Sequence, residues 1–168
     1  ASVVSLGPSV PQPDTLSGSD VRRIEQLIVD NSPERFSRSG ERQLSLNAEE
    51  LNLLAAFVLA NVPQTQEFAA RISLSGDTAL ASLSIPHQVG PLTLYLNLRA
   101  RFAQQQGRAR LLSLHAGYLP VPRRIMRSAE NLAGDRLEVA SAASRELAEL
   151  RHGVNAVILD DDRLHLTL

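Results

Sequence analysis

Apolar and polar residues alternate most regularly near the middle of the chain. Between residues 92 and 102, Leu, Ala or Phe occupies every second position, and mostly polar residues lie between them. Such a period of two is typical of a strand with one face on a core and the other toward water. Residues 70–75 and 79–85 show the same pattern. Together with residues 108–116, they predict a four-stranded antiparallel meander.

The turn between the last two strands of this meander predicts their register. The stretch Gln-Gln-Gly that joins them suits a three-residue hairpin loop whose glycine adopts a left-handed conformation. This loop pairs Gln104 with Arg108 and places Ala100 opposite Leu112 on the apolar face. The preceding connection, residues 86–91, contains two prolines and is expected to be a loop.

Apolar residues at helical spacing predict four helices, at about residues 20–31, 48–60, 121–134 and 135–151. The second helix has the clearest start, because Asn47 and Glu50 have the spacing of a capping box. It holds no polar residue between positions 53 and 60, which is typical of a helix buried on most sides. For the first helix, Ser19 or Asp20 is the expected cap.

These elements predict an α+β fold with a single long antiparallel meander sheet and about four helices packed mainly on one face. A final hairpin is expected at residues 154–168, around three consecutive aspartates. Residues 1–19 are rich in Ser, Pro and Gly and are expected to form a flexible leader or spacer. Residues 20–168 are expected to form one domain, since their number suits a single core.

The charge balance limits the classes of partner. Seventeen basic residues, all of them arginine, are balanced by 18 acidic residues, for a net charge of -1. A dedicated nucleic-acid-binding protein is usually strongly basic, so no nucleic-acid partner is expected. Cysteine is absent, which excludes disulfide bonds and thiolate chemistry within this chain. No apolar run approaches the ~20 residues of a membrane-spanning helix.

No catalytic motif stands out. The four histidines do not lie three or four residues apart, so no helical pair of metal ligands exists: His87, His115, His152 and His165. The aspartates at 160–162 lack the central glycine and late glutamate of a calcium-binding loop. We therefore expect no enzyme activity, no metal and no cofactor. An enzyme without a recognisable motif is the last of the alternatives.

Two groups of residues are candidates for binding. The first would line an apolar groove between the second helix and the sheet: Leu53, Phe57, Val58, Leu94, Leu96 and Leu98. The second would contact anionic headgroups or an acidic protein: Arg99, Arg101, Arg123, Arg124 and Arg127. Ordinary core packing and ordinary surface solvation are the competing interpretations of these two groups.

Two segments resemble a known family. Residues 44–54, Leu-Ser-Leu-Asn-Ala-Glu-Glu-Leu-Asn-Leu-Leu, lead from a short strand into a capped helix. Residues 114–122, Leu-His-Ala-Gly-Tyr-Leu-Pro-Val-Pro, end the meander before a helix. The span between them, about half the chain, resembles the YpmS-like family of N-terminally anchored extracytoplasmic bacterial proteins of unknown function. The resemblance implies a location outside the cytoplasm, in the periplasm or anchored to the inner membrane, and it carries over no catalytic residue.

Two functions remain as the main hypotheses. The first is a non-enzymatic envelope domain that binds a lipid or another apolar ligand between residues 48–60 and the sheet. The alternative is an interaction or scaffold module of an envelope complex, which binds a partner protein through its arginines. Both hypotheses place the domain close to a membrane, through an N-terminal anchor or signal upstream of the residues considered.

Overall fold

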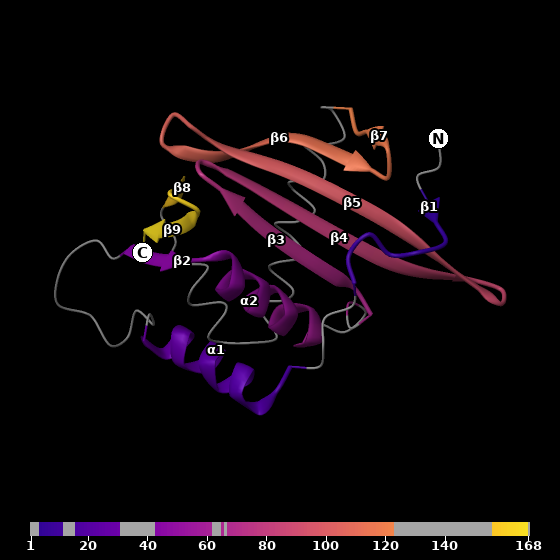
Figure 1. The fold of residues 1–168 in the computed structure, drawn as a ribbon, viewed down its shortest axis with the longest axis horizontal. Helices are drawn as coiled ribbons and strands as arrows, with labels where there is room; N and C mark the ends of the chain where they lie inside the picture. Colours follow the sequence, from indigo (N-terminus) through magenta and orange to yellow (C-terminus); the bar gives the residue numbers. More distant parts are fainter. Residues whose placement is uncertain are drawn as a thin grey trace.

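The computed structural model describes residues 4–11, 16–30, 43–61, 65, 67–122 and 156–167. Within these residues the chain forms two antiparallel sheets and two helices (Figure 1). The larger sheet has six strands: β1 (Val4–Ser5), β3 (Ala69–Ser75), β4 (Thr78–Val89), β5 (Leu92–Gln105), β6 (Arg108–Ala116) and β7 (Leu119–Pro120). The smaller sheet has three: β2 (Gln43–Leu46), β8 (Ala156–Asp160) and β9 (Arg163–Thr167). The helices are α1 (Gly18–Asp30) and α2 (Ala48–Asn61).

The predicted fold class is wrong. Strands dominate the described residues, and they form two sheets rather than one. The cause lies in β2, which pairs with β9 near the other end of the chain instead of joining the meander. Of the four predicted helices, the first two are confirmed as α1 and α2. The third, at residues 121–134, lies outside the described residues except for residues 121 and 122, which are not helical, and the fourth, at 135–151, lies wholly outside them.

The meander itself is confirmed, with strand order β3-β4-β5-β6 and antiparallel pairs throughout. The expected loop at residues 86–91 is wrong, because β4 continues through Pro86 to Val89 and only Gly90 and Pro91 turn the chain. β3 pairs with β4 only as far as Ser84, so Pro86 lies where β4 has a free edge. A proline is tolerated there because no neighbouring strand needs its missing N–H.

The predicted register of the β5–β6 hairpin is also wrong. Gln106 and Gly107 form a two-residue turn with φ of 52° and 75°, and Gln105 pairs with Arg108. Positive φ at both central positions is the geometry of the tight hairpin turn that matches strand twist. The register then shifts between Arg101 and Phe102, so that Leu112 is an extra residue on β6. This bulge reverses which residues of β6 face each side of the sheet.

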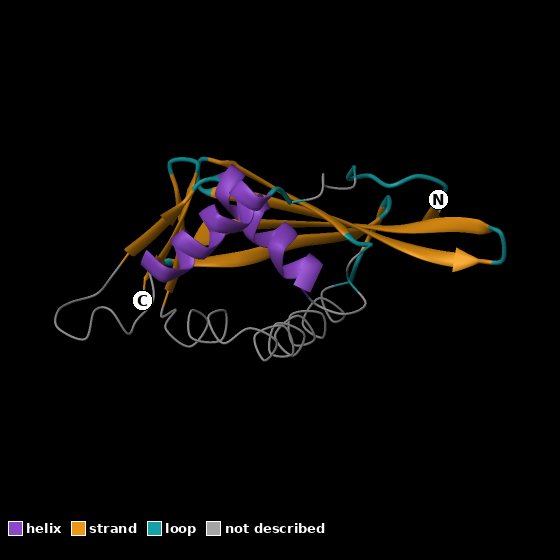
Figure 2. Cartoon of the chain, turned by 90° about the horizontal axis from the view of Figure 1, so that it is seen from below, coloured by secondary structure: helices purple, strands orange, loops and turns teal. Residues whose placement is uncertain are grey.

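Helix α2 lies along the free edge of β3 (Figures 1 and 2). The Asn52 side-chain amide donates to the Ile72 carbonyl at 2.8 Å, and its oxygen accepts from the Ile72 N–H at 2.7 Å. One side chain therefore satisfies both backbone groups of an edge-strand residue, which protects this edge from pairing with another chain. The predicted capping box is confirmed, since Asn47 and Glu50 exchange two hydrogen bonds of 2.9 Å.

Helix α1 starts two residues earlier than expected, at Gly18. Its capping box joins Ser17 and Asp20, where Ser19 or Asp20 was the predicted cap. The hydroxyl and backbone N–H of Ser17 donate to the Asp20 carboxylate at 2.6 and 2.9 Å, and these bonds lower the pKa of Asp20. On the exposed side of the helix pair, Arg23 lies 2.8 Å from Glu49 and links α1 to α2.

The smaller sheet packs against the end of the larger sheet that holds the β3–β4 and β5–β6 turns. The Leu159 N–H donates to the Gln104 side chain at 2.9 Å, and the Gly76 N–H donates to the Asp162 carboxylate. Asp161 and Asp162 form the turn of the predicted final hairpin, both with positive φ. The largest fully buried apolar side chains of the described residues lie on α1 and the smaller sheet: Ile24, Leu46 and Leu159.

Residues 4–10 are fixed on the larger sheet, within the segment expected to be a flexible leader. Val4 and Ser5 pair with Leu96 and Tyr95 on the part of the β5 edge that β6 does not reach. Val10 is 3% exposed, and its N–H donates to the Ser84 hydroxyl at 3.1 Å. We call residues 4–10 the strap, because they cross the larger sheet as an extended segment. Its bends include Gly7, beside Pro8.

Candidate functional site: an arginine face and its cleft

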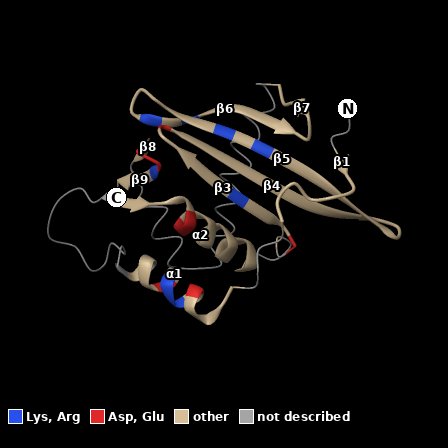
Figure 3. Cartoon of the chain, viewed as in Figure 1, with Lys and Arg blue, Asp and Glu red and all other residues tan. Residues whose placement is uncertain are grey.

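Five arginines project from one face of the larger sheet, and all five are exposed. They are Arg71 on β3, Arg99 and Arg101 on β5, and Arg108 and Arg110 on β6. We call this surface the arginine face. Figure 3 shows the basic residues along these strands.

Strand register places the first three arginines together. Arg71 pairs with Ser82, and Ser82 pairs with Arg99, so the two arginines lie in one row across the sheet. Strands are ~4.8 Å apart, which separates these two Cα atoms by roughly 10 Å. Arg101 lies two residues further along β5, at roughly 7 Å from Arg99 on the same face.

The bulge on β6 adds the other two arginines to this face. Arg110 pairs with Ala103, which has the same orientation on β5 as Arg101. Beyond the bulge, His115 pairs with Arg99 and faces the same side. If all nine residues of β6 alternated regularly with no bulge, Arg108 and Arg110 would lie on the face opposite to His115. The bulge therefore keeps every arginine of this sheet on its polar side.

No carboxylate neutralises this face from within the sheet. The six strands contain five arginines and neither Asp nor Glu. Within the part of the chain that the structure describes, these arginines form no ion pair, and among their side chains only that of Arg110 has a hydrogen bond, of 3.5 Å to Gln106. The nearest acidic residues along the chain are Glu67 and Asp77, in the connections at either end of β3.

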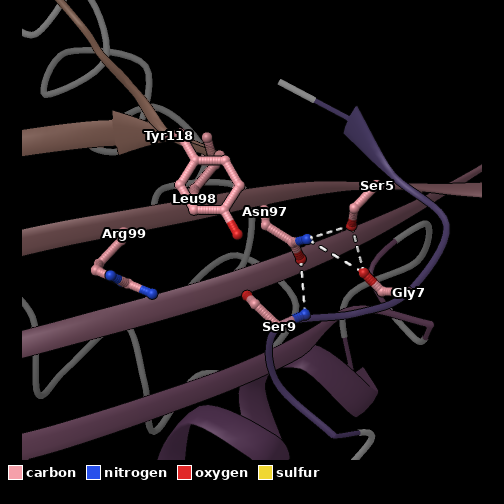
Figure 4. Close-up of a pocket in the computed structure, with 8 residues that line it drawn as sticks. Ser5, Gly7, Ser9, Asn97, Leu98, Arg99 and Tyr118 are labelled. Atoms are coloured by element: carbon pink, nitrogen blue, oxygen red, sulfur yellow. Dashed lines mark hydrogen bonds between the residues drawn. The ribbon is translucent and has the colours of Figure 1, made fainter. Parts of the chain in front are cut away.

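A cleft of about 250 Å³ lies at one end of the arginine face (Figure 4). It is lined by the strap, by β5 and by the turn between β6 and β7: Ser5, Gly7, Ser9, Asn97, Leu98, Arg99, Gly117 and Tyr118. Arg99 belongs to both the cleft and the arginine face. Tyr118 is 88% exposed, and its hydroxyl points toward Asn97 across the cleft.

Asn97 and Ser84 hold the floor of this cleft in place. The Asn97 oxygen accepts from the Ser9 N–H at 2.9 Å and from the Ser84 hydroxyl at 2.6 Å. Its amide nitrogen donates to the Ser5 hydroxyl at 2.7 Å and to the Gly7 carbonyl at 3.2 Å. Because Asn97 is fully engaged in this network, Arg99 and Tyr118 are the side chains left to bind a ligand.

The apolar candidates are divided between two places. Leu53, Phe57 and Val58 lie on α2 and are half-buried. Leu94, Leu96 and Leu98 lie on β5 and are also half-buried. Helix α2 packs on β3, and β4 separates β3 from β5. Of these six residues, Leu98 alone lines the cleft described above.

The arginine candidates are placed more simply. Arg99 and Arg101 are exposed on one face of β5, while Arg123, Arg124 and Arg127 lie outside the described residues. Sequence reasoning placed Arg108 near the turn beside Arg99 and Arg101, but it missed Arg71 and Arg110 as members of the same face. Arg71 occupies a polar position of its alternating strand, and a Gly76-Asp77 turn sets it level with Arg99. The alternation and the turn that place Arg71 could be read from the sequence, whereas no sequence pattern indicates the bulge on β6.

The described residues contain no group of three His, Asp or Glu side chains that could hold a metal ion. Among the same residues, no helix has the length and apolarity to cross a membrane. Comparison of the chain with protein-family models, curated proteins and solved structures finds no match. The resemblance to the YpmS-like family therefore stays a prediction.

Proposed function

We propose that this protein is a non-enzymatic binding module of the cell envelope that engages an anionic partner through its arginine face. The observation that carries this proposal is the presence of five exposed arginines on a six-stranded sheet that has no carboxylate. The interaction-module alternative, in which Arg99 and Arg101 contact a partner, thus becomes the principal function. The envelope location rests on the sequence resemblance and the Ser/Pro-rich N-terminal segment.

Electrostatics supports an external partner. Like charges that lie close together on a sheet destabilise it, and acidic neighbours normally relieve that cost. Here the described acidic residues lie mostly on the helices and the smaller sheet, away from the arginine face (Figure 3). Guanidinium groups bind carboxylates and phosphates through two parallel hydrogen bonds, so a row of them suits an anionic surface.

The test is retention of the purified protein on a sulfonate matrix near neutral pH. We expect retention despite the net charge of -1, because the positive charges are concentrated on one face. Arg99→Glu with Arg101→Glu should abolish retention. The control is Arg22→Glu with Arg163→Glu, which changes the net charge equally but lies on α1 and β9. Equal loss in both double variants would overturn the proposal.

A second candidate, an apolar ligand beside α2, has one observation in its favour. This helix is apolar from Leu53 to Leu59, yet none of its residues is fully buried. Lipid that co-purifies with the wild type and is lost on Phe57→Ser, detected by native mass spectrometry, would support it. A protein free of lipid from native membranes would remove this candidate and leave the arginine face unaffected.

A further inference from the structure

We propose that the anionic partner is a lipid surface, on which the arginine face docks with Leu6 and Tyr118 inserted among the headgroups. This inference rests on the proposed function and specifies its partner. The arginines supply attraction to anionic lipids, and the two apolar side chains supply shallow insertion.

Leu6 and Tyr118 are the most exposed of the large apolar side chains in the described residues, at 77% and 88%. Tyr118 lines the cleft, and Leu6 lies at the bend after β1, between the lining residues Ser5 and Gly7, where the chain turns to cross over Asn97 and Ser84. Arg99 lines the same cleft. A tyrosine beside an arginine is a typical arrangement at a membrane interface, where an aromatic ring sits at the level of the headgroups.

The layout favours lipid over an acidic protein. Protein interfaces place apolar residues at the centre and charged residues at the rim. On this face the order differs: the arginines extend from Arg99 to the β5–β6 turn, and Leu6 and Tyr118 lie on two connections at the opposite end of this charged area. Two exposed apolar side chains beside an extended basic surface suit the headgroup region of an anionic lipid bilayer.

The hairpin between β4 and β5 supplies a matched control. Val89 and Leu92 are 49% and 56% exposed, and they pair with each other at its tip. Leu92 alternates in phase with Leu94 and Leu96, so the register assigns both residues to the opposite face of the sheet. Their substitution removes exposed apolar surface without altering the arginine face.

The experiment is co-sedimentation of the full chain with vesicles of phosphatidylcholine, with and without about one-third phosphatidylglycerol. We expect binding to the anionic vesicles only. The Arg99→Glu and Arg101→Glu double variant should bind at least about tenfold more weakly. Leu6→Ser with Tyr118→Ser should weaken binding about fivefold, while Val89→Ser with Leu92→Ser should bind as the wild type does. Circular dichroism of each variant checks that it is folded.

The outcomes separate this inference from the proposed function. Retention on sulfonate without binding to anionic vesicles would overturn the lipid surface and keep an anionic partner of another kind. Failure in both assays would overturn both proposals. Equal weakening by the two apolar double variants would overturn the assignment of Leu6 and Tyr118 as the inserted residues.

Discussion

The two sheets of this protein differ in both charge and burial. The larger sheet carries five exposed arginines and no carboxylate, and most of its apolar residues are only half-buried. The smaller sheet carries three aspartates around its hairpin turn and, together with α1, holds the largest of the fully buried apolar side chains. A net charge of -1 conceals this separation. The difference indicates that one region stabilises the fold while the other presents a surface for binding.

The largest effect expected from this comparison concerns the core. Leu46→Ala removes a side chain that is 2% exposed on β2 and should lower the free energy of unfolding by about 2–5 kcal/mol. Leu112→Ala, at the bulge of the larger sheet, removes a side chain that is 38% exposed and should cost less than about 1 kcal/mol. Urea denaturation of both variants measures the difference. Equal losses would show that the two sheets share the stabilising role.

An intermediate effect is expected where the strap crosses the larger sheet. Ser84 is 1% exposed, and Ser84→Ala leaves the buried Val10 N–H without its acceptor. The free energy of unfolding should fall by about 1–3 kcal/mol, and limited proteolysis should cut residues 4–11 faster. Ser82→Ala, two residues away on the same strand, should change both quantities little. If the two variants behaved alike, the network around Asn97 would not hold the strap.

The smallest effect concerns the capping box of α1 and the pH dependence of its stability. Hydrogen bonds from the Ser17 hydroxyl and backbone lower the pKa of Asp20. The capping box should therefore stabilise α1 above the unfolded pKa of about 3.9 and lose this effect as pH falls through the lower folded value. An NMR titration of the Asp20 carboxyl should give a midpoint below that unfolded value, and Ser17→Ala should raise it. A midpoint unchanged by this substitution would contradict the assigned cause.

Regular alternation and cap spacing predicted individual elements, whereas the extent of β4, the β5–β6 register and the pairing of β2 with β9 were not predicted. Alternation over residues 92–102 predicted β5, and the spacing of Asn47 and Glu50 predicted the start of α2. Each of these depends on neighbours along the chain. The pairing of β2 with β9 depends on packing between opposite ends of the chain, so no local pattern reveals it.

The candidate site shows the same division. Arg99 and Arg101 share a face because they alternate on one strand, and that was predictable. The places of Arg108 and Arg110 depend on the bulge at Leu112, which only the pairing of two strands can show. The cleft could not be predicted either, because the strap that closes it forms hydrogen bonds with residues more than 70 positions away.

The measurement that tests the central claim most directly is an NMR titration of the isotope-labelled chain with dextran sulfate. Binding by the arginine face predicts that amide shifts change first on β3, β5 and β6, around Arg71, Arg99 and Arg110, while α1, α2 and the smaller sheet stay unchanged. Shift changes confined to the helices or to Arg163, with none on the larger sheet, would contradict it.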